Sequence, residues 1–217
     1  MAVNNLQGMR YPCEAIIRFF YKEKLNLRKG GKVLEIGCGS ANNLLHFSSY
    51  GWDVTGIDYS SDSLSMAEHN LKVNGASGKF ITHDLQYPVP ILGETYDLFL
   101  APNVLYYLSR EAAIQRLQEI NSLLNKDAFI FIRMRLADDH RYGRGTNVGK
   151  AAWKFDFSYT GELGLSNVFW TEYELVDLFR DSFGISFDAL TILKFTYENI
   201  QNDIIIKNSD IVIWGRK

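Results

Sequence analysis

The sequence predicts an α/β fold in which a mainly parallel, doubly wound sheet carries helices on both faces. Through the first 135 residues, short apolar segments typical of buried strands alternate with segments of helical periodicity. Such alternation requires right-handed crossovers, which place helices on the two faces of a parallel sheet. The chain has 217 residues, 47% of them hydrophobic, so it can bury one core without disulfides. We therefore expect a single domain over residues 1–217.

In the first half of the chain, glycines and polar caps separate the predicted elements. The predicted strands are 32–36, 52–58, 79–85 and 95–102, and the predicted helices are 12–28, 42–50 and 60–74. Gly30-Gly31 and Gly51 end the first two helices, and Ser60 or Ser61 caps the third. After each strand, a turn or a helix therefore leads the chain back to the edge of the sheet where the next parallel strand begins.

In the second half, the regular alternation is interrupted. The remaining predicted elements are helices 110–124 and 171–183 and strands 128–135, 185–197 and 210–214, the last two joined by polar stretches. Thr171 and Glu174 have the capping-box spacing at the start of the last helix. Residues 136–170 are rich in aromatic side chains but have no clear period, and so long an irregular segment in a compact domain is usually functional. We predict that 136–170 is an inserted cap that binds a substrate.

The segment "VLEIGCGSANN", residues 33–43, reads as a strand that turns through Gly37 and Gly39 into a helix. This arrangement presents backbone N–H groups and a positive helix end at the carboxyl edge of the sheet, where open α/β sheets bind ligands. Asp58 follows 21 residues after Gly37, at the end of the next strand, where it can accept hydrogen bonds from a ribose. A nucleoside-type ligand is predicted, although a bare Gly-x-Gly can also serve only as a tight turn.

Three further residues refine the prediction. Asn42 occupies the position of the third glycine of a dinucleotide fingerprint, which counts against a pyrophosphate. Glu35 lies in an otherwise apolar strand, where a carboxylate is costly unless it has a partner. Asp84 ends the third strand and supplies another acceptor at the same edge.

The segments "VLEIGCGSANN", "VTGIDYS", "ITHDL" and "YDLFLAPNVLYYL" resemble, in order and spacing, the class I S-adenosylmethionine-dependent methyltransferases. The resemblance implies the Rossmann-like methyltransferase fold, with seven strands of which the last is antiparallel, so that 210–214 lies beside 185–197. It also implies S-adenosylmethionine as cofactor, S-adenosylhomocysteine as its product, and no metal.

Carried over residue by residue, the resemblance implies a cofactor site. Its members are Tyr11 over the cofactor, Glu35 as tether of the loop or the amino group, Gly37, Cys38 and Gly39 against the methionine part and ribose, Asn42 at the start of the helix, Asp58 at the ribose hydroxyls, Tyr59 beside the adenine, Asp84 and Leu85 at the adenine edge, and Asn103 near the sulfonium or the acceptor.

Departures from related patterns indicate the kind of acceptor. Enzymes that methylate nucleobase amines carry Asp/Asn/Ser-Pro-Pro-aromatic after the fourth strand, whereas this chain has Ala101-Pro102-Asn103-Val104. Catalytic cysteines of the carbon-5 pyrimidine enzymes also have no counterpart, because Cys38 lies in the cofactor turn. We expect methyl transfer by in-line displacement to an oxygen or nitrogen of a small molecule.

The predicted catalytic residues are His140, Asn103 and Tyr106. His140 lies in the irregular segment at the sheet edge and would act as general base, because a hydroxyl acceptor needs one. The alternative is an ordinary exposed loop histidine. Tyr106 and the adjacent Tyr107 would face the acceptor.

The cap also supplies predicted substrate contacts. Arg135, Arg141 and Arg144 form a positive cluster that could hold a carboxylate or phosphate of the acceptor. The alternative is that they pair with Asp138, Asp139 and Asp156 and merely order the cap. Trp153 and Trp170 would wall the acceptor pocket, or else form the core of the cap.

Composition limits partners and location. The 23 basic and 25 acidic side chains give a net charge of −2, which counts against a nucleic-acid partner. No apolar run approaches a membrane span, no signal peptide is expected, and two cysteines are typical of a reducing cytoplasm. We expect a cytoplasmic monomer or homodimer. Two rival functions stay open: a nicotinamide-dependent oxidoreductase, and a non-catalytic methyltransferase-like protein that only binds the cofactor.

Overall fold

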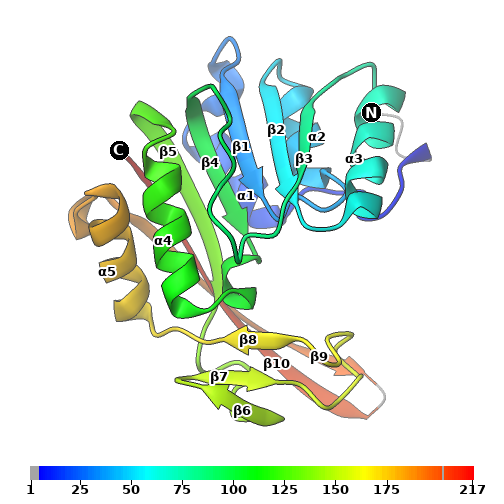
Figure 1. Ribbon diagram of the computed structural model, residues 1–217, viewed down its shortest axis with the longest axis vertical. Helices are drawn as coiled ribbons and strands as arrows, with labels where there is room; N and C mark the ends of the chain where they lie inside the picture. The colour runs from blue at the N-terminus through cyan, green and yellow to red at the C-terminus, as the bar shows by residue number, and fades with distance from the viewer. Residues whose placement is uncertain (1–4, 202) are drawn as a thin grey trace.

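The computed structural model describes residues 5–201 and 203–217, which fold around one seven-stranded sheet (Figure 1). The strands of this sheet are β1 Lys32–Ile36, β2 Asp53–Asp58, β3 Lys79–Thr82, β4 Tyr96–Pro102, β5 Leu124–Arg135, β9 Thr191–Gln201 and β10 Ile204–Arg216. The helices are α1 Glu14–Lys22, α2 Asn42–Ser48, α3 Ser61–Val73, α4 Arg110–Asn121 and α5 Glu172–Phe183, with short 3₁₀ turns η2 Leu25–Leu27, η3 Leu105–Tyr107 and η4 Phe187–Ala189.

The strand order is β3-β2-β1-β4-β5-β10-β9. Strands β1 to β5 run parallel to one another, whereas β10 is antiparallel to both β5 and β9. The predicted α/β fold, with seven strands of which the last in the chain is antiparallel, is confirmed.

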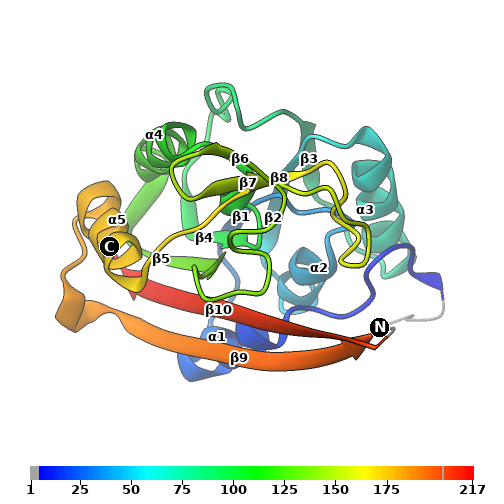
Figure 2. The same ribbon diagram turned by 90° about the horizontal axis from the view of Figure 1, so that it is seen from below.

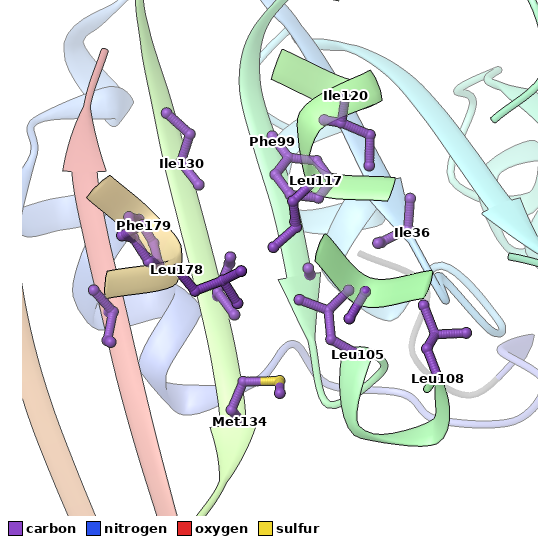
Figure 3. Packing of buried hydrophobic residues seen from close by; sticks show 14 of the residues in the cluster. Ile36, Phe99, Leu105, Leu108, Leu117, Ile120, Ile130, Met134, Leu178 and Phe179 are labelled. Atoms are coloured by element: carbon purple, nitrogen blue, oxygen red, sulfur yellow. The ribbon is translucent and has the colours of Figure 1, made fainter. Parts of the chain in front are cut away.

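Two apolar clusters cover the two faces of the sheet. Helices α1, α2 and α3 pack on one face, and α4 and α5 pack on the other. Strand β5 serves both, because Phe129 and Phe131 belong to the first cluster and Ile130 and Ile132 to the second, as the alternation of a strand requires. Figure 3 shows labelled members of the second cluster: Ile36, Phe99, Leu105, Leu108, Leu117, Ile120, Ile130, Met134, Leu178 and Phe179.

The closing hairpin is longer than the sequence predicts. Residues 198–201 and 204–209, predicted as largely polar connections, belong to β9 and β10. The two strands pair along their whole length, from Ile204 opposite Gln201 to Trp214 opposite Thr191, so the pairing includes the polar residues as well as the apolar ones. Polar side chains are compatible with this extension because Glu198 and Asn199 are exposed on β9, the edge strand in Figure 2. On β10, the buried Asn208 accepts from Arg141, and the N–H of the buried Ser209 donates to Asp139.

The predicted cap does contain regular structure. Strands β6 Thr146–Gly149, β7 Ala152–Lys154 and β8 Ser166–Val168 form a separate three-stranded antiparallel sheet. It lies below the carboxyl ends of the main strands in the view of Figure 1 and overlies them in Figure 2. Strands of three or four residues are too short to show a period in sequence. Within the described residues, no helix is long and apolar enough to span a bilayer.

Candidate active site

The turn after β1 needs glycine for steric reasons. Gly37 has φ +64°, and a Cβ there would lie 2.5 Å from Cγ2 of Val104. Its N–H donates to the carbonyl of Ile57 at 2.7 Å, which ties the turn to the neighbouring strand. Gly39 has φ +51° but faces open space. The turn is therefore closed at its base and open where a ligand can approach.

Asp58 at the end of β2 fixes the shape of this turn. Its Oδ2 accepts from the N–H of Gly39 and its Oδ1 accepts from the N–H of Ser60, both at 2.9 Å. Each carboxylate oxygen has a second lone pair, so Asp58 can also accept from ligand hydroxyls. The side chain is thus already oriented before any ligand binds.

Glu35 is the most unusual group at the site. It is 1% exposed, and its Oε1 accepts from the side-chain amide of Asn43 at 2.7 Å. Across residues 5–201 and 203–217, Oε2 has no hydrogen-bond partner. Burial, aided by the charge of Asp58, raises the pKa of Glu35 from 4.5 to about 8. At neutral pH the carboxyl of Glu35 therefore holds its proton, and a cation bound beside it would favour its ionisation.

Two adjacent cavities open along the carboxyl edge of the sheet. The first has a volume of about 1020 Å³ and lies over Glu35 and the glycine turn, extending to β5 and β9; the second, of about 450 Å³, lies beside Asp58 and the end of β3. Gly37 and Asn103 line both. Asn103 has φ +59°, an uncommon conformation for a residue that is not glycine, and it directs the chain between the two cavities.

The N-terminal segment, residues 6–13, borders the first cavity and is held by polar side chains. Asn70 accepts from the N–H of Gln7 and donates to its carbonyl, Ser40 Oγ accepts from the N–H of Met9, and Asn43 Oδ1 accepts from the N–H of Cys13. Asn42 donates to the carbonyl of Tyr11 at 2.8 Å.

Of the four residues whose side chains hold the N-terminal segment, only Asn42 was predicted at the site. The pattern that indicated it in the sequence was the pair Asn42-Asn43 directly after a glycine turn. Ser40 and Asn70 gave none, because a polar residue facing a distant segment looks like a surface residue in sequence.

The far end of the first cavity is formed by β5, β9 and the start of α1. Arg133 donates from Nη2 to Asp210 at 2.6 Å and from Nη1 to the sulfur of Cys13 at 3.2 Å. Although burial disfavours its charge, Asp210 raises the pKa of Arg133, which stays a cation. Phe195 and Tyr197 complete this end. Sequence reasoning missed Arg133, because it lies within an apolar strand pattern.

The comparisons with known proteins agree with this geometry. A family model described as a methyltransferase domain matches residues 33–127. Ribosomal RNA small subunit methyltransferase C of Alcanivorax borkumensis is 34% identical over 64 residues, which cover 30% of this chain and 20% of that protein. A probable S-adenosyl-L-methionine-dependent methyltransferase TehB of Haemophilus influenzae is 29% identical over 91 residues, covering 41% and 31%. The crystal structure of a SAM-dependent methyltransferase from Methanosarcina mazei has a TM-score of 0.69 at 21% identity and covers 95% of this chain and 98% of that chain.

The predicted resemblance to the class I S-adenosylmethionine-dependent methyltransferases is confirmed by the family model over residues 33–127, by the named relatives and by the shared fold. The chain spans only a fifth to about a third of the two curated relatives named above.

Every residue that was predicted to bind the cofactor lines one of the two cavities. Tyr11, Glu35, Gly37, Cys38, Gly39, Asn42 and Asn103 line the first, and Asp58, Tyr59, Asp84 and Leu85 line the second. They come from five separate segments of the chain, yet the parallel sheet gathers their strand ends at one edge. Among the described residues, no group of histidine, cysteine and acidic side chains is arranged to hold a metal.

The predicted catalytic and substrate residues of the cap lie elsewhere. His140, Arg135, Arg141, Arg144, Trp153 and Trp170 line neither cavity, and neither does Tyr106. Nε2 of His140 lies 3.1 Å from the hydroxyl of Tyr159, and burial together with Arg144 lowers the pKa of His140. Tyr106 is 4% exposed, beneath the guanidinium of Arg135 at 4.5 Å from the ring centre. As catalytic groups, both His140 and Tyr106 stay predictions that this arrangement does not favour.

Two of the three arginines predicted to contact the substrate are buried in internal ion pairs. Arg135 and Arg141 both pair with Glu162, and Arg141 also pairs with Asp139 at 2.9 Å. Burial opposes ionisation of Glu162, but the two arginines hold its pKa below the ordinary value. The alternative in which these arginines order the cap matches the contacts, with Glu162 as the partner that the sequence did not reveal.

The other cap residues are similarly engaged. Arg144 donates to the carbonyl of His140 at 2.8 Å. Trp153 packs against Tyr142 and Phe169, and Trp170 lies under the guanidinium of Arg110. Both tryptophans therefore contribute to packing within and beneath the cap.

Proposed function

We propose that the protein transfers the methyl group of S-adenosylmethionine to an oxygen or nitrogen of a small-molecule acceptor. The observation that carries the proposal is Glu35, which lines the first cavity and whose buried Oε2 has no hydrogen-bond partner among the described residues. An ammonium group of an amino-acid ligand would satisfy this oxygen and stabilise its charge.

The remaining residues of the two cavities fit the rest of the cofactor. The Asp58 carboxylate, held by two backbone amides, accepts from ribose hydroxyls. Asp84 and the buried Leu85 stand at the edge of the second cavity, where they contact the adenine. Bound S-adenosylmethionine supplies a sulfonium methyl group that a nucleophile displaces in line. The chain contributes mainly by alignment, since holding two reactants in the correct geometry removes much of the barrier.

The acceptor site that we propose is the far end of the first cavity. Asn103 stands between the cofactor turn and this end, and Arg133 borders it with an Nε that has no partner in the described chain. The guanidinium would orient an oxygen of the acceptor, while Phe195 and Tyr197 would contact its apolar part. An amine acceptor needs only to arrive neutral, so no protein base is required for it.

Several features support a small acceptor over nucleic acid, although one relative is named a ribosomal RNA methyltransferase. Arg133 and Lys194, the cations that line the first cavity, are paired with Asp210 and Glu172. A nucleic-acid site needs unpaired cations that replace the counterions of phosphates. The N-terminal segment also encloses the first cavity on one side.

The nicotinamide rival is disfavoured by the charge of the site. Glu35 and Asp58 both stand at the glycine turn, and a diphosphate placed there would meet the carboxylate of Asp58 and oppose the ionisation of Glu35. In place of a third glycine, Asn42 is engaged with the carbonyl of Tyr11. The pyrophosphate cradle of a dinucleotide site would need that position small and free.

Calorimetric titration of the protein with S-adenosylmethionine, S-adenosylhomocysteine and NADH tests the cofactor. We expect both adenosyl ligands to bind with a Kd near the micromolar range and NADH not to bind. Binding of NADH alone would refute the proposal. If the adenosyl ligands bind, incubation with panels of small amines, acids and phenols tests transfer; the absence of any methylated product would favour the non-catalytic alternative.

A further inference from the structure

Strand β9 forms one edge of the sheet and within the described residues pairs only with β10 (Figure 2). It is eleven residues long, contains no proline, and exposes Lys194 and residues 196–200. A long open edge strand presents a row of unpaired backbone groups, which is a ready template for another strand. The question is which strand fits it.

Hydrogen bonds on the other side of β10 show which backbone groups face outward. The N–H of Leu136 donates to the carbonyl of Ser209 at 2.9 Å, and the N–H of His140 donates to the carbonyl of Lys207 at 2.8 Å. The backbone N–H and C=O groups of the odd-numbered residues in this part of β10 therefore point away from β9. Since successive residues of a strand direct these groups to opposite sides, those of the even-numbered residues point towards β9.

The register transfers this alternation to β9. Asp210 is paired with Phe195 and Asn208 with Tyr197, so the odd-numbered residues of β9 bond to β10. The residues between them direct their N–H and C=O groups outward; these are Ile192, Lys194, Thr196, Glu198 and Ile200.

We propose that two copies of this chain pair antiparallel through β9, about a two-fold axis at Thr196. Thr196 is the midpoint of Thr191–Gln201, so this register overlaps the whole strand. It places Lys194 opposite Glu198 of the second copy, and symmetry forms this pair twice. The outward backbone groups of both strands then meet each other.

Charge selects this register over its neighbours. The two nearest registers that keep outward groups facing each other are centred on Phe195 and on Tyr197, and both leave Lys194 and Glu198 opposite uncharged residues. The next two are centred on Lys194 and on Glu198, and each places one of these charges opposite its own copy. Like charges directly opposite each other destabilise a strand pair, whereas opposite charges stabilise it.

The charged side chains are available for this pairing. Glu198 has no ion-pair partner among the described residues, and Lys207, opposite it on β10, pairs with Asp138 at 3.3 Å. Lys194 contacts Glu172 on α5 and is about half exposed, so it can also reach across the edge.

The other face of the paired strands supplies apolar contacts next to the active site. In the Thr196 register, Phe195 stands opposite Tyr197 of the second copy, and cross-strand aromatic pairs are stabilising. Both residues line the first cavity. The second copy would therefore border the acceptor end of this cavity. The pairing itself is deduced from the edge strand and does not rest on the proposed function.

The first test measures mass by light scattering from about 1 to about 200 µM, because small interfaces associate weakly. We expect the wild-type chain to approach twice its 24.8 kDa mass as concentration rises. Lys194→Glu and Glu198→Lys should each be monomeric, because each places like charges in the pair. Mixing the two single variants should restore a dimer, since their charges are then complementary. The control, Lys72→Glu on α3, changes charge equally but lies away from β9 and should dimerise as wild type.

The second test measures register by disulfide formation. Residues opposite each other in a hydrogen-bonded antiparallel pair have Cα atoms about 5.5 Å apart, within the range of a disulfide. Thr196→Cys should therefore cross-link to itself on mild oxidation. Glu198→Cys should not, because the two copies of residue 198 are four strand positions, about 13 Å, apart.

These outcomes decide the proposal. A wild-type chain that is monomeric at about 200 µM overturns it. Failure of the mixed single variants to dimerise, or equal cross-linking at positions 196 and 198, also overturns it. Misfolding cannot mimic the expected result, because two misfolded variants would not restore each other on mixing.

Discussion

Replacing Glu35 by Gln tests the state of the buried carboxylate, because glutamine keeps the shape and the hydrogen-bonding capacity towards Asn43 but carries no charge. Burial raises the pKa of Glu35 from 4.5 to about 8. A carboxyl whose pKa is higher in the folded than in the unfolded chain holds its proton more tightly when folded. It therefore lowers the free energy of unfolding progressively as pH rises from 4.5 to about 8.

The size of the effect follows from this shift. In the unliganded protein, the carboxyl of Glu35 lowers the free energy of unfolding by about 1 kcal/mol at pH 5 and by about 4 kcal/mol at pH 8, as upper limits. Glu35→Gln removes this cost. We expect the variant to exceed the wild type in unfolding free energy by several kcal/mol at pH 8 and by little at pH 5.

Urea unfolding without cofactor, at both pH values, measures the difference, and Glu68→Gln on the exposed part of α3 is the matched control.

In titrations, Glu35→Gln should bind S-adenosylmethionine at least tenfold more weakly, because the ammonium loses its charged partner. Wild-type affinity should rise with pH up to about 8, as Glu35 loses its proton on binding. The reasoning fails if the stability difference between variant and wild type is the same at pH 5 and pH 8.

Four other changes test single parts of the structure. Asp58→Ala should weaken binding of both adenosyl ligands about tenfold or more by calorimetry, since charge-assisted hydrogen bonds contribute about 1.5–3 kcal/mol each; unchanged affinity would refute its role. Gly37→Ala should lower the unfolding free energy by about 2 kcal/mol or more through the contact with Val104 and the positive φ, and Val104→Ala in the same chain should recover part of it. Asn70→Ala should release the N-terminal segment, seen as faster hydrogen exchange at residues 7–9, and weaken cofactor binding while the fold persists. Thr171→Ala should cost about 1 kcal/mol in urea unfolding because it removes the capping box of α5, and Thr171→Ser should cost much less.

The sequence by itself determined the sheet and the cofactor end of the site. Strand β1, the glycine turn and Asp58 follow from local rules, because a strand that enters a helix through glycine has few possible geometries. Parallel crossovers then bring the strand ends to one edge, so residues predicted separately line two adjacent cavities. No long-range contact had to be known for this.

The tertiary structure alone decided the cap and the acceptor end. Arg135, Arg141 and Arg144 form a local positive cluster in the sequence, yet the fold buries the first two against Glu162, about two dozen residues away along the chain. Arg133 looks like an interruption of an apolar strand until pairing with β10 brings Asp210 beside it. The partner of a charge depends on which distant segments the fold brings together, and local periodicity carries no information about that.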